Sequence, residues 1–156
     1  MELTSAALRD GEPIPLRYTK DGENLSPPLR WSGLPEGARE LVLFCENITP
    51  ETQEPFVQWL VYGIGADARE LPEGYQHKAA PEEPLALRQG RNDIGNVGYD
   101  GPLGSVGKTV RYRFRLLAVD RELGLAPGED KQSVGAAISR HVLDEAALTV
   151  VHERQA

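Results

Sequence analysis

The glycine-rich segment 90–109 contains the residues that come nearest to a known chemical motif. Gly107-Lys108-Thr109 matches the end of a phosphate-binding P-loop, but that motif needs a glycine five residues before Gly107, where this chain has Pro102. A P-loop lysine also begins a helix whose amides face the phosphates, whereas the pattern here predicts a strand. The spacing of Gly95, Gly98 and Gly101 does not read G-x-G-x-x-G, so a dinucleotide site is not predicted either.

Other residue types that could support catalysis or metal binding are scattered. His77, His141 and His152 fall in segments predicted as loop, helix and strand, and none has a second ligand at zinc spacing. The chain has no G-x-S-x-G elbow, and its single Cys45 lies in the apolar run LVLFC, which predicts a buried, unreactive thiol. We therefore expect no metal and no cofactor, and we interpret the protein as a non-enzyme, although triad members need not be neighbours in sequence.

Residues 110–118, which directly follow the glycine-rich loop, must position that loop. Residues 110–118 alternate between apolar or aromatic side chains and Arg111, Arg113 and Arg115, which predicts a half-buried strand. Such a strand would bring the loop amides and the ring of Tyr112 to one end of a sheet, a suitable place for a small ligand. The alternative is a tight crossover in which the glycines only permit positive φ angles.

The remaining pattern is that of a mainly β chain. Strands are predicted at the N-terminus and over residues 29–31, 40–46, 56–64 and 148–152, with mostly loop over 65–89. Gln58 is the polar exception in the apolar run FVQWLVYGI. One amphipathic helix is predicted from the stripe Val134, Ala137, Ile138 and His141, with Asp130 or Ser133 as its N-cap.

Length and charge restrict the class of protein. A chain of 156 residues is expected to form one domain, residues 1–156. Its formal net charge of −7 disfavours nucleic acids and anionic membrane surfaces as partners. No segment has the pattern of a signal peptide or the length of a membrane span. We therefore expect a cytoplasmic protein that is not inserted in a membrane.

Several motifs, taken in order, resemble one protein family. The run ENLSPPLRW at residues 23–31 resembles the ENxSPPLxW signature of the bacterial Raf kinase inhibitor-like branch of the phosphatidylethanolamine-binding protein family. It is followed by LPEG twice, by RNDIG and GYDGP in the glycine-rich loop, and by RYRF and LAVD in the predicted strand. The resemblance extends from about Leu3 to Val151. It implies a Greek-key β-sandwich with a large antiparallel sheet and a short C-terminal helix.

The resemblance also implies a small anion pocket at one end of the sheet. In related proteins this pocket binds phosphate, phospholipid head groups or acetate-like ions, and it is lined by a DPDAP-type aspartate, a strand histidine, a Gly-Pro loop and the histidine and tyrosine of an HRY motif. Three positions of this chain match, namely Gly101, Pro102 and Tyr112. Three differ: the loop Asn47-Ile48-Thr49-Pro50-Glu51 has Asn47 for the aspartate, and Gln58 and Val110 replace the two histidines.

These replacements remove the charge that would compensate a buried anion. A histidine can donate a hydrogen bond and become charged near neutral pH, whereas Gln58 can only donate and Val110 can do neither. Two hypotheses remain open. The first is a ligand-binding protein with an altered pocket at Asn47, Gln58, Gly101, Pro102, Val110 and Tyr112. The second is a regulatory or protein-interaction module whose pocket has decayed. The resemblance to bacterial relatives also suggests a homodimer as the oligomeric state to test.

Overall fold

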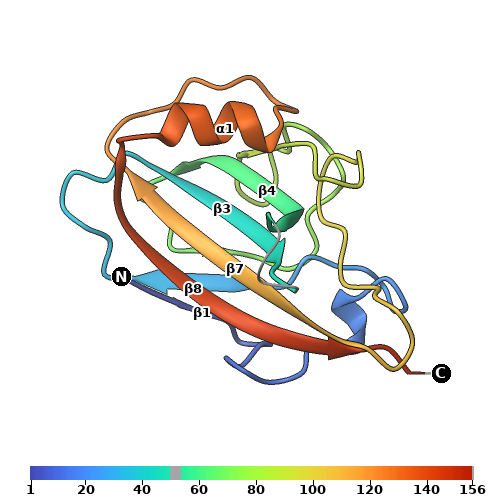
Figure 1. The fold of residues 1–156 in the computed structure, drawn as a ribbon. Helices are drawn as coiled ribbons and strands as arrows, with labels where there is room; N and C mark the ends of the chain where they lie inside the picture. Colours follow the sequence, from blue (N-terminus) through green and yellow to red (C-terminus); the bar gives the residue numbers. More distant parts are fainter. Residues whose placement is uncertain (50–53, 156) are drawn as a thin grey trace.

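The computed structural model describes residues 1–49 and 54–155 as two antiparallel sheets, one α-helix and a short 3₁₀ turn, η1 (Leu16–Tyr18) (Figure 1). The smaller sheet has the strand order β1 (Glu2–Thr4), β2 (Leu29–Ser32) and β5 (Glu70–Leu71). The larger sheet has the order β6 (Arg88–Gln89), β4 (Phe56–Gly65), β3 (Glu40–Asn47), β7 (Thr109–Val119) and β8 (Val142–Glu153). The predicted mainly β fold is thus confirmed. Pro50 and Glu51 of the expected pocket loop lie outside the described residues.

The main core lies between the two sheets. Leu43, Trp59 and Phe114 of the large sheet are fully buried in the same cluster as Leu29 and Trp31 of the small sheet. Cys45 belongs to this cluster with no exposed surface, as predicted, and burial raises the pKa of its thiol well above the ordinary value. This core fixes which face of β3, β4 and β7 points toward the small sheet.

The opposite face of the large sheet is covered by α1 (Lys131–Ile138), which Figure 1 shows lying across it. Val134 and Ile138 of the helix pack in a second cluster with Val42 and Leu117. Because both faces of the central strands are covered, β3 and β4 read as almost continuous apolar runs. The N-cap is Asp130, whose carboxylate accepts a hydrogen bond from the Ser133 amide at 2.9 Å.

The end of the helix and the start of β8 differ from the prediction. The helix ends at Ile138, and Arg140 has a left-handed backbone with φ of 68°, so His141 lies beyond the helix and its Nδ1 contacts Asp120 Oδ1 at 2.8 Å. The strand β8 begins at Val142 instead of Leu148. It pairs with β7 along almost its whole length, which places Val110 directly opposite His152.

Candidate functional site

The six predicted pocket residues lie around one loop, residues 100–104, at the end of the large sheet. Gly101 and Pro102 belong to this loop, and Gln58 Nε2 donates a hydrogen bond to the Asp100 carbonyl at 2.7 Å. Val110 lies beside Gly104, where an added Cβ would be 3.7 Å from Val110 Cγ2. Asn47 and Tyr112 are register partners of β3 and β7 and therefore point to the same face. The structure thus brings these residues to one end of the sheet.

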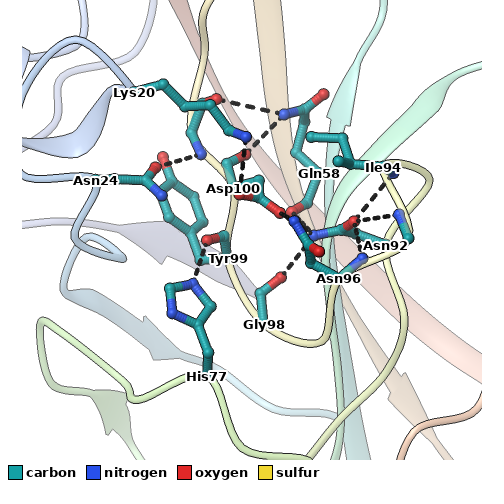
Figure 2. Close-up of polar contacts among 12 residues, drawn as sticks. Lys20, Asn24, Gln58, His77, Asn92, Ile94, Asn96, Gly98, Tyr99 and Asp100 are labelled. Carbon is teal, nitrogen blue, oxygen red and sulfur yellow. Dashed lines mark hydrogen bonds and ion pairs between the residues drawn. The ribbon is translucent and has the colours of Figure 1, made fainter.

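Gln58 owes its orientation to a β-bulge. Glu46 pairs with Val57 and Cys45 pairs with Trp59, so Gln58 is the extra residue of β4 at this point. A β-bulge changes the direction of a side chain, and bulges are common next to functional sites. Here the Gln58 amide, which is buried, faces the loop and not the apolar core (Figure 2). The sequence predicted that Gln58 was exceptional, but not that the backbone was irregular.

Tyr112 and Asn47 contribute neutral polar groups. Burial raises the pKa of the Tyr112 phenol to about 12, the neighbouring Cys45 thiol adds to this rise, and the Leu103 backbone amide opposes it. The phenol is therefore protonated at neutral pH and can act as a hydrogen-bond donor. The Asn47 side-chain oxygen accepts a hydrogen bond from the Thr49 amide at 2.9 Å. That bond leaves the Asn47 NH₂ group without a partner among the described residues.

The loop is held in place by a buried polar network (Figure 2). Asn92 accepts hydrogen bonds from the amides of Ile94, Gly95 and Asn96 at 3.0–3.1 Å, and its Nδ2 donates to Asp100 Oδ2 at 2.6 Å. The second Asp100 oxygen contacts the Lys20 ammonium at 3.0 Å. Burial alone raises the pKa of the Asp100 carboxyl, but hydrogen bonds from Asn92, Asn96 and Lys20 outweigh it, so the pKa lies below 3.8.

Further contacts tie the loop to the N-terminal part of the chain. Asn24 Oδ1 accepts a hydrogen bond from the Gly101 amide at 2.7 Å (Figure 2). The Tyr99 hydroxyl donates to the Tyr18 carbonyl at 2.7 Å, and the Tyr99 carbonyl lies 2.8 Å from His77 Nε2. Sequence reasoning placed Asn24, Asn92 and Asp100 in family motifs but assigned them no hydrogen bonds. Asn and Asp in turns and loops are typical of such loop-stabilising bonds.

Glu46 does not contribute a negative charge to the loop site. The side chain is buried, and its Oε1 lies 3.1 Å from the guanidinium groups of both Arg113 and Arg115. Two strand arginines thus balance the charge of this acid. The six pocket positions consequently offer amides, a phenol, a valine and backbone groups.

The described residues form neither a metal centre nor a membrane-spanning helix. Over residues 1–49 and 54–155, no cluster of three His, Cys, Asp or Glu side chains is arranged to bind a metal ion. Within the same residues, no helix has the length and apolar character needed to span a bilayer.

The fold and the site together define the class of protein. It is a two-sheet β-sandwich in which hydrogen bonds hold a glycine-rich loop at the end of the larger sheet. The sequence model of the phosphatidylethanolamine-binding protein family matches residues 4–153. The chain therefore belongs to the phosphatidylethanolamine-binding protein family, as its sequence motifs predicted.

Relatives in distant organisms share nearly the full length of the chain. A UPF0098 protein of Methanothermobacter thermautotrophicus is 41% identical and covers 99% of both chains, and UPF0098 protein YbhB of Escherichia coli is 34% identical over 97% of this chain and 99% of its own. Among solved structures, a phosphatidylethanolamine-binding protein homologue, CT736 of Chlamydia trachomatis, aligns with a TM-score of 0.85 at 32% identity, covering 99% and 97% of the two chains. E. coli YbcL aligns with a TM-score of 0.88 at 27% identity, covering 99% and 98%.

Proposed function

We propose that this protein binds a small uncharged polar molecule beside loop 100–104, where β3, β4 and β7 end. The observation that carries the proposal is unused hydrogen-bonding capacity. Gln58 Oε1 receives no hydrogen bond from any described residue, while Nε2 of the same amide is committed to the loop. The Tyr112 hydroxyl hydrogen and the Asn47 NH₂ group likewise have no acceptor in the part of the chain that the structure describes. One acceptor and two donors would suit a ligand that both donates and accepts.

The preference for an uncharged ligand follows from the charges around the loop. Lys20 is paired with Asp100 at 3.0 Å, so its charge is already compensated. Arg113 and Arg115 are paired with Glu46. Desolvating an anion without a compensating charge is costly, and Gln58 and Val110 supply none. We therefore expect phosphate and phosphorylethanolamine, the ligands implied by the family resemblance, to bind weakly or not at all.

The experiment is a proton–nitrogen NMR titration of the wild-type protein with phosphate, with phosphorylethanolamine and with a panel of small neutral amides and alcohols. We expect saturable shifts at Gln58, Gly101 and Tyr112 with a neutral compound only. A Tyr112→Phe variant should bind that compound about 2- to 10-fold more weakly, since a neutral hydrogen bond contributes about 0.5–1.5 kcal/mol. The matched control is Tyr75→Phe, because Tyr75 is also a buried tyrosine, donates to the Leu85 carbonyl at 3.2 Å and is not one of the six loop-site positions.

Saturable phosphate shifts at the same residues would contradict the uncharged ligand. A flat panel in a folded protein would contradict ligand binding and favour the second hypothesis, a regulatory or protein-interaction module with the long loop 65–89 as a contact surface. Thermal unfolding gives an independent check, since a ligand at a hundred times its Kd adds about 2.7 kcal/mol to the free energy of unfolding.

We also propose that the protein is not an enzyme. The six positions supply no acid, base or nucleophile other than a phenol whose pKa is about 12. Detectable turnover that is lost in the Tyr112→Phe variant would contradict this proposal.

A further inference from the structure

A concave site separate from the loop site lies at the C-terminal end of β8. It is a cavity of about 730 Å³, which falls in the range of sites for small molecules. Its lining includes none of the six residues of the loop site. It comes from η1 and the segment before it, from the turn before β7, and from the end of β8, and the residues that matter most are Ile14, Leu16, Val106, Val151, His152 and Arg154.

Backbone hydrogen bonds hold the walls of this cavity in place. The Ile14 amide donates to the Val151 carbonyl at 2.8 Å, and the Val151 amide donates to the Glu12 carbonyl at 3.1 Å, so the N-terminal segment lies along the free edge of β8. On the other side, the Gly107 amide donates to the Arg154 carbonyl at 3.0 Å. The cavity is therefore bordered by segments that are hydrogen-bonded to the large sheet.

The mouth of the cavity is apolar although it faces solvent. Leu16 is 61% exposed and Val106 is 54% exposed, more than the other large hydrophobic residues that the structure describes. Both line the cavity, as do Ile14 and Val151. Exposed apolar groups gathered around a concavity are typical of a binding site.

One buried polar atom in the lining has no hydrogen-bond partner among the residues that the structure describes. His152 is only 8% exposed, and its Nε2 is buried without a hydrogen bond to any described residue. Buried polar atoms are nearly always hydrogen-bonded, so an unpaired ring nitrogen requires an explanation. A ligand in the cavity would supply one.

The charges of the lining select the ligand class. Arg154 Nε contacts Asp21 Oδ2 at 3.0 Å, and Glu153 adds a second carboxylate to the lining. Two carboxylates and one guanidinium give a net negative charge, which disfavours an anion. A hydroxyl group can donate or accept, so it can pair with Nε2 in either imidazole tautomer. We propose that this cavity binds a neutral amphiphile, an alcohol whose apolar body lies against Ile14 and Val106 and whose hydroxyl pairs with His152.

The probe for this proposal is 1-hexanol, compared with hexanoate, and the readouts are the imidazole nitrogen resonances of His152 and the methyl resonances of Ile14 and Val151. We expect saturable shifts at these groups with hexanol and an affinity for hexanoate at least about 10-fold weaker. His152→Phe keeps a ring but removes Nε2, and should weaken hexanol binding about 2- to 10-fold. The matched control His141→Phe alters an imidazole outside the cavity and should leave the affinity unchanged.

A second variant keeps the test valid if His152→Phe does not fold. Leu16→Glu changes an exposed residue of the rim and should also weaken hexanol binding, because it places a charge against the apolar chain of the ligand. Three results would overturn the proposal: no saturable shifts with hexanol, tighter binding of hexanoate than of hexanol, or unchanged hexanol affinity in the folded variants. Shifts confined to Gln58 and Tyr112 would place hexanol at the loop site and would also overturn it.

Discussion

Val110 and His152 lie directly opposite each other on β7 and β8. Register partners of an antiparallel pair point to the same face of a sheet, so the His152 imidazole and the two methyl groups of Val110 are neighbours. The family resemblance implies a histidine at the position of Val110. In this chain the imidazole at this level of the sheet belongs instead to the edge strand, and it lines the β8 cavity and not loop 100–104. The loop site therefore has a valine where the family resemblance implies a histidine, while the His152 imidazole lies on the neighbouring strand.

The first prediction is that a phosphate site can be restored. In a Gln58→His, Val110→His double variant, two imidazoles would replace a bulge amide that already faces the Asp100 carbonyl and a valine beside Gly104. Protonated imidazoles would supply the charge that a buried phosphate requires. We expect titration calorimetry at pH 6 to give a saturable phosphate heat for the double variant and none for the wild type.

The control for this prediction is His152→Phe in the double-variant background. His152 would face the imidazole introduced in place of Val110 across the two strands, and a proton on either ring would disfavour protonation of the other. Removing His152 should therefore preserve or strengthen phosphate binding. A folded double variant with no phosphate heat would contradict the prediction.

The central strands could be predicted because their patterns have one dominant cause. Strict alternation marked β7, and nearly continuous apolar runs marked β3 and β4, whose two faces are covered by α1 and by the small sheet. The boundary between α1 and β8 was not predictable from periodicity. His141 continues the apolar stripe of the helix, but the helix ends before it because Arg140 has a left-handed backbone. The strand β8 therefore begins at Val142, six residues earlier than predicted.

The candidate site was predictable in its residues but not in its contacts. The ordered motifs predicted that Gln58, Gly101 and Tyr112 lie at one end of the sheet, and the structure places Gln58 beside the loop of Gly101 there. That these residues bind a ligand stays a prediction. The polar network could not be predicted from local pattern, because Lys20 meets Asp100 and Asn24 meets Gly101 across about eighty residues of chain. The β8 cavity was missed for a related reason, since its walls come from three segments far apart in the sequence, near η1, before β7 and at the end of β8.

The second prediction concerns Asp100→Asn. One Asp100 oxygen faces the Lys20 ammonium, and the other faces the amide donors of Asn92 and Asn96. An asparagine would place its NH₂ group against a donor in either orientation. We expect a loss of about 2 kcal/mol in the free energy of unfolding measured by urea denaturation. Glu70→Gln, in the exposed pair with Arg30, should cost no more than about 0.5 kcal/mol.

The same variant has an expected pH signature. The pKa of Asp100 in the folded protein lies below 3.8, so its carboxylate contributes stability that is present above pH 3.8 and is lost as the pH falls through the folded value. The difference in unfolding free energy between wild type and Asp100→Asn should therefore shrink in strong acid. A constant difference from pH 6 to pH 2 would show that this carboxylate is not the origin of the effect.

The third prediction compares two glycine substitutions. An added Cβ at Gly101 would lie far inside contact distance of the Tyr18 carbonyl oxygen, whereas at Gly135 in α1 nothing lies within 4 Å. Gly101→Ala should therefore lower the free energy of unfolding by about 1–3 kcal/mol, as overpacking does, and displace loop 100–104. Gly135→Ala should raise it by about 0.5–1 kcal/mol, because alanine is the better helix former. Equal signs in thermal unfolding would contradict the described packing of Gly101.

The fourth prediction follows from the burial of His152. Burial lowers the pKa of its imidazole below 6.5, Asp21 opposes this shift and Arg154 adds to it. The folded protein binds this proton less readily than the unfolded chain does, so the stabilising contribution is present above pH 6.5 and is lost as the pH falls toward the folded pKa. The slope that it adds cannot exceed about 1.4 kcal/mol per pH unit. We expect urea denaturation between pH 7.5 and pH 5 to show a steeper loss of stability for wild type than for His152→Phe. Asp21→Asn should lower the His152 pKa further and extend the loss to lower pH, and identical slopes for wild type and His152→Phe would show that the imidazole is not buried as described.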